Sequence, residues 1–394
     1  MWVLALINFF NYFDRQVIFP LFAFLKTDYQ LTDFELGLLG TVFMVIHSVT
    51  SVPLGILADR WIRKNIISLG VLLWSVATFF SGLVRNYHQL LIARSIVGIG
   101  EAAYAPSATS LLSDQFPEEE RAGVISKFNL GMFAGGTLGM MLAGVLGTYF
   151  GWRICFFIVG LPGFILALLS WTISEKKQPH HLDIHIERES IHSIFKSLPY
   201  IMILTGGVLL TFTSGSIISW ITIFMVRYHN FTVSEASLSL GSIVLVAGLA
   251  GIYFGGFLAD KFYRRGIPRS FVIGIGFLAA TPLLLIIINV ESSWALIASL
   301  IAGTFFMAWY YGPVVALIQD IVPSHLKATA YAYYLFFVHL LGDTLSPSII
   351  GKISDVSSLK TAFYLPIITN LLGALCFLIT TRIIKNNKEQ FQAK

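Results

Sequence analysis

The sequence predicts an all-α membrane protein of twelve transmembrane helices, arranged as two six-helix halves related by a pseudo-twofold axis. Three observations predict this fold: an apolar composition, twelve apolar stretches of spanning length, and loop motifs that occur twice. Of the 394 residues, 56% are hydrophobic and 12% are charged, and the mean hydropathy is +0.77. A soluble domain usually carries about 25% charged residues, so the composition excludes a water-soluble fold and an intrinsically disordered chain.

A helix needs about 20 mostly apolar residues to cross a bilayer. Twelve stretches qualify: 2–24, 34–58, 65–84, 89–112, 122–146, 153–173, 199–226, 235–259, 270–289, 293–319, 328–350 and 361–381. They are predicted to be helices, because lipid offers no partner for backbone groups and the alternation of barrel strands is missing. The first stretch has no basic segment or small-residue cleavage site, so we interpret it as a span and not as a signal peptide. This span begins almost at Met1, so the sequence does not decide whether the native protein starts further upstream.

The basic residues predict the orientation. One alternate set of loops and the C-terminal tail hold 17 of the 26 Lys and Arg residues, the other loops hold six, and three lie within spans. The positive-inside rule then places both termini and the central linker in the cytoplasm. The predicted division is a bundle at 1–174, a linker at 175–197, a second bundle at 198–384 and a tail at 385–394.

The linker and the cysteines carry no predicted chemistry. Residues 184–195 of the linker suit a short helix lying on the membrane surface. Its four histidines lack the spacing of a metal site, and we interpret the segment as solvated. Cys155 and Cys376 lie far apart within apolar stretches, so neither a disulfide framework nor a metal site is predicted.

Two loop motifs repeat along the chain. GILADRWIRK recurs as GFLADKFYRR at an offset of 201 residues, and DQFPEEERA recurs as DIVPSHLKA at an offset of 206. Duplicated halves are typical of transporters. The acids and cations of these loops are predicted to form an ionic latch, or gate, on the cytosolic rim. Alternatively, the cations only set the topology. The predicted gate residues are Gly55, Asp59, Arg60, Arg63, Lys64, Arg121, Asp260, Lys261, Arg264 and Arg265.

Charged residues within spans are costly and indicate function. The first span carries Asp14 and Arg15, and the fourth carries Arg94 and Glu101. Arg94 and Glu101 are seven residues apart, so they share a helix face about 10 Å apart along the axis. The four groups are expected to meet near mid-membrane, where their charges sum to zero and pairing offsets desolvation.

This cluster has a functional and a structural interpretation. In the functional one, Glu101 exchanges a proton, because burial and neighbouring arginines act on its carboxyl in opposite directions. In the structural one, the pairs only hold the first and fourth spans together. His339, one turn before Asp343 in the eleventh span, is either a second proton-responsive group or a hydrogen-bonded interior histidine.

The motifs resemble a known family. INFFNYFDRQ, GLLGTVFMV, GILADRWIRK, LLWSVATFFSGL, ARSIVGIGEAAYAPSATSLLSDQFPEEERA and GWRICFF are similar to the bacterial Spinster branch of the major facilitator superfamily. The similarity continues more weakly through WYYGPVVALIQDIVP and LLGDTLSPSIIGKISD. The usual superfamily loop has Gly where Ile62 and Tyr263 stand here, which indicates a slightly altered turn. The span-5 antiporter motif is absent: the run is GMFAGGTLG, whose Gly131, Gly135 and Gly139 still allow close helix contact.

The resemblance implies a secondary transporter of the bacterial inner membrane that carries a lysophospholipid or sphingoid-type lipid, coupled to protons. It assigns the coupling site to Asp14, Arg15, Arg94 and Glu101. Aromatic walls with a few hydroxyls suit an acyl chain, and an arginine suits an anionic head group. The predicted substrate-binding residues are therefore Asn11, Arg15, Arg94, Glu101, Tyr104, Trp220, Trp309, Tyr310, His339 and Asp343.

Other functions would require different features of the chain. A proton symporter of small organic anions or sugars differs by a more polar cavity. A lipid enzyme would need a motif such as H-E-x-x-H or G-x-S-x-G, and neither is present. A scramblase or receptor would lack coupling. The sequence has no Walker loop, so ATP is not expected to drive transport. No cofactor, metal or nucleic acid is expected, the energy source is the proton gradient, and the protein is expected to be monomeric.

Overall fold

The computed structural model describes the backbone of residues 1–175, 194–323 and 326–392. These residues form helices and loops, and no strand occurs among them. The predicted all-α fold is therefore confirmed. The predicted surface helix at 184–195 lies almost wholly outside the described residues.

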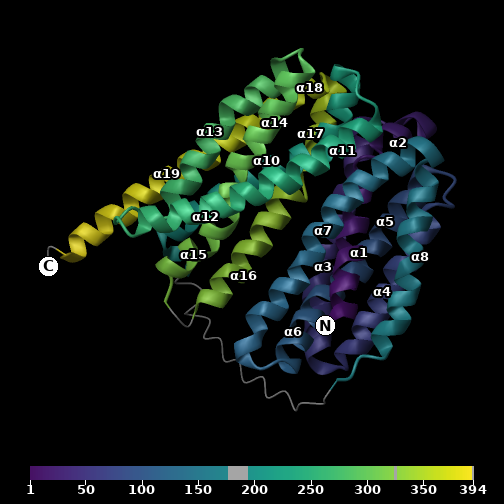
Figure 1. Cartoon of the computed structure of the whole chain (residues 1–394), viewed down its shortest axis with the longest axis horizontal. Helices are drawn as coiled ribbons and strands as arrows, with labels where there is room; N and C mark the ends of the chain where they lie inside the picture. Colours follow the sequence, from purple (N-terminus) through teal and green to yellow (C-terminus); the bar gives the residue numbers. More distant parts are fainter. Residues whose placement is uncertain (176–193, 324–325, 393–394) are drawn as a thin grey trace. The chain divides into compact units, whose positions relative to one another are not determined.

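The first part of the chain forms eight helices (Figure 1). They are α1 (Trp2–Val17), α2 (Phe22–Tyr29), α3 (Asp33–Arg60), α4 (Arg63–Ser81), α5 (Tyr87–Ala102), α6 (Tyr104–Gln115), α7 (Glu118–Phe150) and α8 (Trp152–Trp171).

The second part begins with α10 (Leu198–His229), and its helices are interrupted more often. They are α11 (Val233–Ile243), the π-helical turn η1 (Val244–Gly248), α12 (Leu249–Tyr263), α13 (Ser270–Asn289), α14 (Ser293–Met307), the 3₁₀ turn η2 (Ala308–Tyr310), α15 (Tyr311–Ile321), α16 (Lys327–Val338), the π-helical turn η4 (His339–Asp343), α17 (Ser346–Val356), α18 (Leu359–Ala362) and α19 (Tyr364–Gln392).

Nine helical segments of the described chain are long and apolar enough to cross a membrane. They are Asp33–Ala58, Arg63–Ser81, Gly123–Phe150, Trp152–Trp171, Leu198–His229, Val233–Tyr263, Ser270–Asn289, Ser293–Ile321 and Leu359–Asn386. The predicted stretches 2–24, 89–112 and 328–350 are not among them. Each of these three contains a break between shorter helices, at Ile18–Leu21, at Ala103 and at Thr344–Leu345.

Proline accounts for the three breaks. Pro20, Pro106 and Pro347 stand at or just after them, and a proline cannot donate to the carbonyl four residues earlier. At the third break the freed carbonyl has a substitute donor, because the Ser346 hydroxyl donates to the Asp343 carbonyl at 3.2 Å. Two of the interrupted spans, 2–24 and 89–112, carry two charged residues each, more than any other predicted span.

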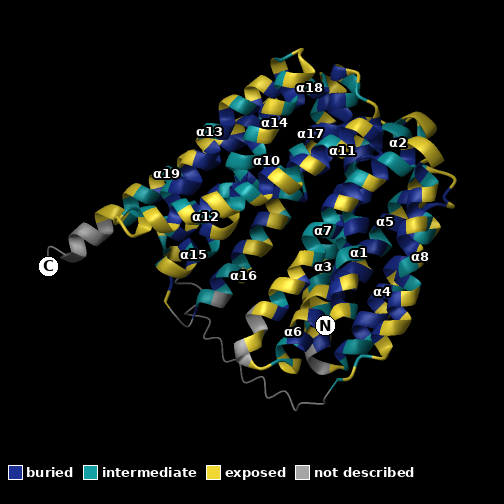
Figure 2. Ribbon diagram, in the orientation of Figure 1, coloured by how far each residue is buried: buried dark blue, intermediate teal, exposed yellow. Residues whose placement is uncertain are grey.

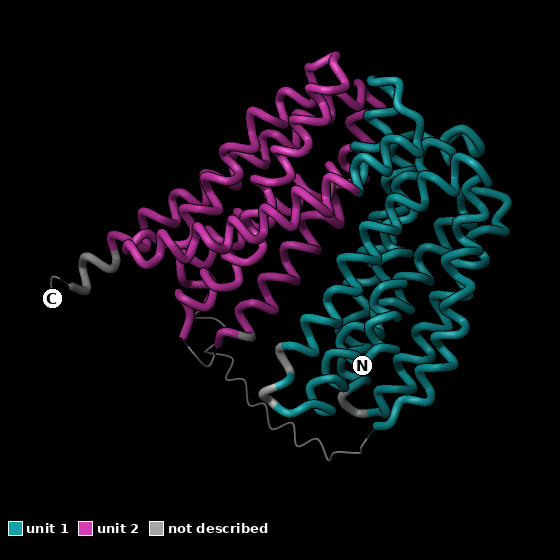
Figure 3. Tube along the Cα trace, in the orientation of Figure 1, with its two compact units in different colours: residues 1–182, 219–241 teal, residues 183–218, 242–394 magenta. Residues whose placement is uncertain are grey.

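The chain divides into two compact units (Figure 3). Unit 1 comprises Met1–Leu182 and Ser219–Gly241, and unit 2 comprises Asp183–Ile218 and Ser242–Lys394. The end of α10 and most of α11 therefore belong to unit 1. In both units the helices alternate between buried and exposed positions (Figure 2), and large apolar side chains such as Leu130 and Val246 are exposed. Exposed apolar faces are expected where lipid is the solvent.

Glycines bring the helices of unit 1 into close contact. A Cβ at Gly131, Gly135 or Gly139 of α7 would clash with the backbone of α1 at Ala5, Phe9 and Phe13. The close contact expected from the GMFAGGTLG run is therefore confirmed. Gly98 of α5 lies in the same way against the backbone of α3 at Phe43 and His47. The approach at Gly98 places α3 beside the charged residues of α5.

Two similar turns, 200 residues apart in the sequence, show the internal repeat directly. Gln30 and Asn230 are the two non-glycine residues with positive φ in the described chain, at 52° and 58°. Two residues later Thr32 and Thr232 start a helix, and each exchanges hydrogen bonds with the glutamate three positions on, at 2.8–3.2 Å. This reciprocal capping begins α3 in one copy and α11 in the other.

Candidate functional site

The last turn of α1 carries two neighbouring charges, Asp14 and Arg15. It ends at Val17, shortly before the break at Pro20. Asp14 is 1% exposed, whereas the Arg15 side chain is 16% exposed. Successive residues on a helix point in different directions, about 100° apart. The two charges therefore meet different partners.

Asp14 pairs with Arg94 of α5. The Arg94 Nη1 donates to Asp14 Oδ1 at 3.1 Å, and the Thr78 hydroxyl of α4 donates to Oδ2. Arg94 is fully buried. Both carboxylate oxygens are bonded, whereas Nε and Nη2 of Arg94 are buried without a hydrogen-bond partner among the described residues. This pair connects α1, α4 and α5.

Arg15 pairs with Glu101, which lies in the last turn of α5. The Arg15 Nη2 donates to Glu101 Oε2 at 3.1 Å and the Arg15 Nε reaches the same oxygen at 3.4 Å. The Glu101 side chain is completely buried, and its Oε1 has no hydrogen-bond partner among the described residues. The Arg15 Nη2 also lies 3.2 Å from Nε2 of His47 on α3. This pair is bonded on one side only and includes a histidine.

Phe43 of α3 lies next to both arginines. The Arg94 guanidinium carbon is 4.8 Å from the ring centroid, and that of Arg15 is 5.5 Å away. A cation over an aromatic face gains about 0.5–2 kcal/mol, more when it is desolvated. Sequence reasoning missed Phe43, Thr78 and His47. Phenylalanine, threonine and neutral histidine do not stand out in an apolar stretch of sequence. Their role becomes visible only when the packing of the helices is known.

The expected cluster of four charges is thus present as two separate ion pairs. Asp14 pairs with Arg94 and Arg15 with Glu101, all within unit 1. The crossed pairing follows from the adjacency of Asp14 and Arg15, because one α1 residue faces the earlier part of α5 and the next faces its end. The proposed roles of the four residues remain predictions.

Other predicted residues of unit 1 lie in its interior. Tyr104 is fully buried, its hydroxyl donates to the Leu4 carbonyl, and its ring packs on Trp74 with centroids 5.9 Å apart. The Asn11 amide nitrogen is buried without a hydrogen-bond partner among the described residues. Trp220 is buried against Phe22, with ring centroids 5.4 Å apart. Their contact with a substrate stays a prediction.

Unit 2 holds the remaining predicted residues. The His339 Nδ1 lies 2.9 Å from Asp343 Oδ2 within η4, and Asp343 Oδ1 is buried without a partner among the described residues. The Tyr310 hydroxyl bonds that of Tyr334. Trp309 packs on the Phe306 ring at 5.2 Å. Whether these groups contact a substrate also stays a prediction.

The loop motif of unit 1 forms a bonded junction at the start of α4. Arg63 pairs with Asp114 at the end of α6. The two Glu175 oxygens accept hydrogen bonds from the backbone N–H groups of Arg63 and Lys64 at 3.1 and 3.0 Å, which caps the helix. A Cβ at Gly55 would lie 4.0 Å from the Pro106 Cβ, so the position has room for a side chain. The side chains of Asp59, Arg60 and Arg121 lie outside those that the structure describes.

The copy in unit 2 uses a different arginine. Arg269 donates to Asp260 Oδ1 at 3.1 Å and also pairs with Asp320. Partial burial lowers the pKa of Arg269, but the bonds to Asp320 and Asp260 outweigh this and raise it, so the side chain stays charged. Arg264 and Arg265 are exposed, and the Lys261 amine lies 5.9 Å from the Phe257 ring. Arg269 was not among the predicted gate residues.

The repeat explains this difference. Arg63 and Arg269 are 206 residues apart, as are their partners Asp114 and Asp320. Asp59 and Asp260 are 201 apart, so the second copy has five additional residues between the aspartate and the arginine. The change of offset between the two repeated motifs was the available signal for Arg269.

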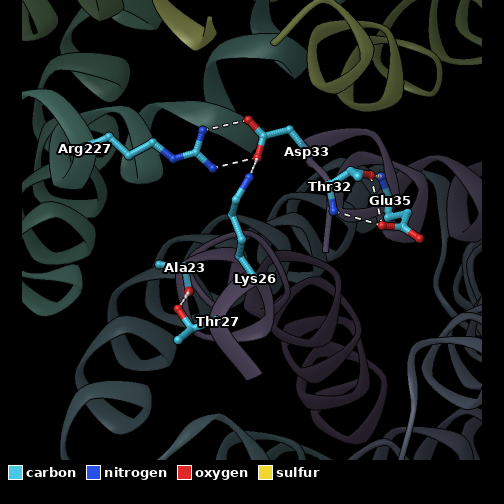
Figure 4. A network of polar contacts seen from close by, with 7 residues as sticks. All are labelled: Ala23, Lys26, Thr27, Thr32, Asp33, Glu35 and Arg227. Atoms are coloured by element: carbon cyan, nitrogen blue, oxygen red, sulfur yellow. Dashed lines mark hydrogen bonds and ion pairs between the residues drawn. The ribbon is translucent and has the colours of Figure 1, made fainter. Parts of the chain in front are cut away.

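A further ion-pair network joins the end of α10 to the start of α3 (Figure 4). Arg227 donates to both oxygens of Asp33 at 2.6 and 2.7 Å, and Lys26 pairs with the same carboxylate. Asp33 is 2% exposed and begins α3, where a carboxylate is favoured by the helix dipole. The network fixes the last turns of α10 within unit 1.

The comparisons with known proteins identify the family. The family model of the Major Facilitator Superfamily matches residues 4–347, and a second match covers 203–393. The chain belongs to the major facilitator superfamily. Its fold is accordingly the all-helical fold of this superfamily of transporters, and the chain is not an enzyme.

Several of the individual relatives are Spinster proteins. Protein spinster of Drosophila melanogaster is 25% identical over 90% of this chain, which spans 61% of the fly protein. The sphingosine-1-phosphate transporter SPNS2 of Xenopus tropicalis is 27% identical, with 98% of this chain and 82% of that protein covered. These similarities confirm the predicted resemblance to the Spinster family.

Solved structures agree. A bacterial homolog of the human lysosomal transporter Spinster, in an inward-facing and occupied conformation, is 25% identical, with a TM-score of 0.87 over 97% of this chain and 96% of that one. A D-xylose–proton symporter gives 0.73 at 17% identity over 95% and 96%, which shows the common fold alone. This superfamily member is therefore a Spinster-like membrane transporter, with the charged site on α1 and α5.

Proposed function

We propose that the chain is a proton-coupled carrier of an amphiphilic lipid, of the lysophospholipid or sphingoid type, that works by rocker-switch alternating access. The observation that carries the proposal is the Arg15–Glu101 pair. Glu101 is buried, one of its oxygens is bonded by Arg15, and the other has no partner among the described residues. The oxygen without a partner can take up a proton, and this proton would neutralise the Glu101 carboxylate.

Protonation of Glu101 would change how α1 and α5 interact. A neutral carboxylic acid holds Arg15 less strongly than a carboxylate does, because protonation removes the Coulomb attraction between the two opposite charges. Arg15 is the more exposed arginine of the two, so its release presents a cation to an anionic head group. The proton would thereby couple the state of α5 to the binding of substrate.

The Asp14–Arg94 pair supports a different part of the proposal. Both Asp14 oxygens have donors and both residues are almost completely buried. Such a pair is costly to break, by about 3–5 kcal/mol when one partner is removed. We infer that it holds α1 on α5 throughout the cycle while the Arg15–Glu101 pair opens and closes.

The lipid substrate is proposed from the relatives and from the interior of unit 2. One relative is a transporter of sphingosine-1-phosphate, an amphiphile with an anionic head. Aromatic side chains of η2, α15 and α16 are partly exposed and suit an acyl chain, namely Tyr310, Tyr311, Tyr331 and Phe336. Contact of Trp309, His339 and Asp343 with the cargo belongs to the same proposal.

The topology completes the proposal. We infer twelve crossings, three of them by the interrupted pairs α1–α2, α5–α6 and α16–α17, with bundles at 1–174 and 198–384 and both termini in the cytoplasm. The membrane is proposed to be a bacterial inner membrane, in keeping with the bacterial Spinster homolog of similar fold. The loop pairs of Arg63 and Arg269 then lie on the cytosolic rim and Asp33–Arg227 on the outer rim. The carrier is proposed to be monomeric.

Uptake into proteoliposomes tests the coupling. Wild-type protein should accumulate fluorescent lysophosphatidylethanolamine or a sphingoid phosphate when a pH gradient is imposed. The Glu101→Gln variant should bind the lipid in detergent but lose gradient-driven uptake by about 10²-fold, the scale of removing a positioned proton-transfer group. Asp28→Asn, a change at an exposed ion pair with Arg153, is the control and should keep uptake.

Two outcomes would overturn parts of the proposal. Uptake that ignores the pH gradient would remove proton coupling. Gradient-driven uptake of xylose or a small organic acid, with no lipid uptake, would replace the lipid by the alternative substrate class.

A further inference from the structure

The proposed proton site contains a third ionisable side chain, His47 of α3. Its Nε2 lies 3.2 Å from Arg15 Nη2, the same nitrogen that donates to Glu101 Oε2 at 3.1 Å. An NH₂ group carries two hydrogens, so one Arg15 nitrogen can serve both acceptors at once. His47 and Glu101 thus both accept from the same guanidinium group.

The packing of α3 on α5 places His47 there. A Cβ at Gly98 would meet the Phe43 carbonyl and the His47 backbone nitrogen, so the absence of a side chain at Gly98 allows the two helices to touch at this level. Gly98 lies between Arg94 and Glu101 on α5, and Phe43 contacts both arginines. His47 follows Phe43 by one turn and its ring lies 6.0 Å from that of Phe43.

The contact determines the charge and tautomer of the histidine. A guanidinium group has hydrogen-bond donors and no acceptor. The His47 Nε2 must therefore accept the bond from Arg15, which requires a neutral ring with its hydrogen on Nδ1. In a protonated His47, the Nε2–H donor would face the N–H donors of Arg15, and the positive imidazolium would face the positive guanidinium group.

The surrounding charges decide what a proton on His47 would do. The groups that face it are Arg15, with Tyr12 under its guanidinium group, and beyond them Asp14, Arg94 and Glu101. The two carboxylates and two arginines sum to zero. A proton on either His47 or Glu101 leaves one net positive charge, and a proton on both leaves two, so the two protonations oppose each other.

We propose that His47 is a positioning residue for proton coupling. When Glu101 takes its proton and its hold on Arg15 weakens, the neutral imidazole still accepts a hydrogen bond from Arg15 and orients the guanidinium group that is presented to the head group. When His47 itself is protonated at acid pH, it repels Arg15 and keeps Glu101 as the carboxylate, so coupling stops. This inference rests on the proposed function of Glu101 and adds an acid limit to its working range.

The pH dependence of gradient-driven lipid uptake tests the role. Below the pKa of His47, each pH unit reduces the neutral fraction about tenfold, so wild-type uptake should fall on the acid side with that slope. His47→Gln retains an oxygen acceptor that does not titrate, so its acid limb should disappear while uptake at neutral pH stays within about twofold of wild type. His47→Phe fills similar space without an acceptor and should reduce uptake about tenfold or more at every pH, the cost of one lost hydrogen bond to a charged group.

The matched control is His88→Gln, the same substitution at an exposed histidine at the start of α5. It should leave the pH profile unchanged. A side-chain ¹⁵N NMR spectrum of histidine-labelled protein in detergent gives a second readout that folding alone does not produce. One of the nine histidines, identified by its loss in His47→Gln, should show the neutral ring with hydrogen on Nδ1 near pH 7.

The results separate this inference from the proposed function. Identical pH profiles of wild type and His47→Gln, or a His47 resonance with its hydrogen on Nε2, would overturn the role of His47 and leave Glu101 untouched. Undiminished gradient-driven uptake by Glu101→Gln would overturn the proposed function instead.

Discussion

The two units repeat the same elements but differ in what they bury. Unit 1 buries Asp14, Asp33, Arg63, Arg94 and Glu101, whereas no Asp, Glu, Lys or Arg is buried among the described residues of unit 2. The offset of 206 that relates Asp114 to Asp320 also relates Tyr104 to Tyr310, but it carries Arg94 onto Leu300 and Glu101 onto Met307. The two units thus share repeated elements, but buried charged residues occur only in unit 1 among the described residues.

The difference teaches that the charged site is not required by the fold. Leu300 is 3% exposed and packs in unit 2 without any ion pair, at the position that Arg94 occupies in unit 1. Buried ion pairs are rarely more stabilising than apolar packing of the same volume. Their presence in unit 1, and not among the described residues of unit 2, agrees with the coupling role proposed for unit 1.

The largest effect is expected from Arg94→Met. It leaves Asp14 buried with only Thr78 as a donor, and should reduce the free energy of unfolding by about 3–5 kcal/mol. Leu300→Met at the repeated position is the control and should cost less than about 1.5 kcal/mol. Both are measured by chemical unfolding in detergent micelles. Equal effects would break the comparison, whereas partial recovery in the double variant Asp14→Asn, Arg94→Met would sharpen it.

A smaller effect is expected at the repeated tyrosines. Tyr310→Phe leaves the buried Tyr334 hydroxyl without its partner and should cost about 1–3 kcal/mol. Tyr104→Phe removes a donor from the Leu4 carbonyl, which lies within α1, and should cost about 1 kcal/mol. The same unfolding measurement applies. A larger loss of unfolding free energy for Tyr104→Phe than for Tyr310→Phe would contradict this expected order.

The smallest effect is expected at the repeated loop pairs. Asp320→Asn leaves Arg269 with Asp260 as a second carboxylate, so the loss should stay below about 1 kcal/mol and shrink with added salt. Asp114→Asn should cost more, because the Arg63 side chain is only 6% exposed. Unfolding at low and high ionic strength measures both. Asp320→Asn as the costlier change would reverse the expected order.

Much of the fold was predictable because it depends on local properties. The apolar stretches predicted helices, and the Gly131–Gly139 spacing predicted a close contact that α7 makes with α1. The three interrupted spans were not predicted as breaks, although Pro20, Pro106 and Pro347 were visible. Whether a membrane helix breaks at a proline depends on substitutes for the lost bond, such as the Ser346 hydroxyl, and these exist only once the chain has folded.

The candidate site was predictable only in its charges. Asp14, Arg15, Arg94 and Glu101 stand out because ionised groups in an apolar stretch are costly, whatever the packing. Their pairing depends on which face of α1 meets α5. Phe43, His47 and Thr78 act through contacts across 28 residues or more of sequence, and nothing in their own composition indicates those contacts.

The sequence by itself determined that this chain is a helical membrane protein with duplicated elements, a major facilitator motif and four costly charges. These follow from composition, spacing and repetition, which are properties of neighbouring residues. Tertiary structure alone decided which acid meets which arginine, that Arg269 takes the place of Arg264 in the second loop, and that His47 shares Arg15 with Glu101. Such contacts depend on how each helix is rotated about its axis and how closely it approaches its neighbour, and the sequence pattern of a single helix specifies neither.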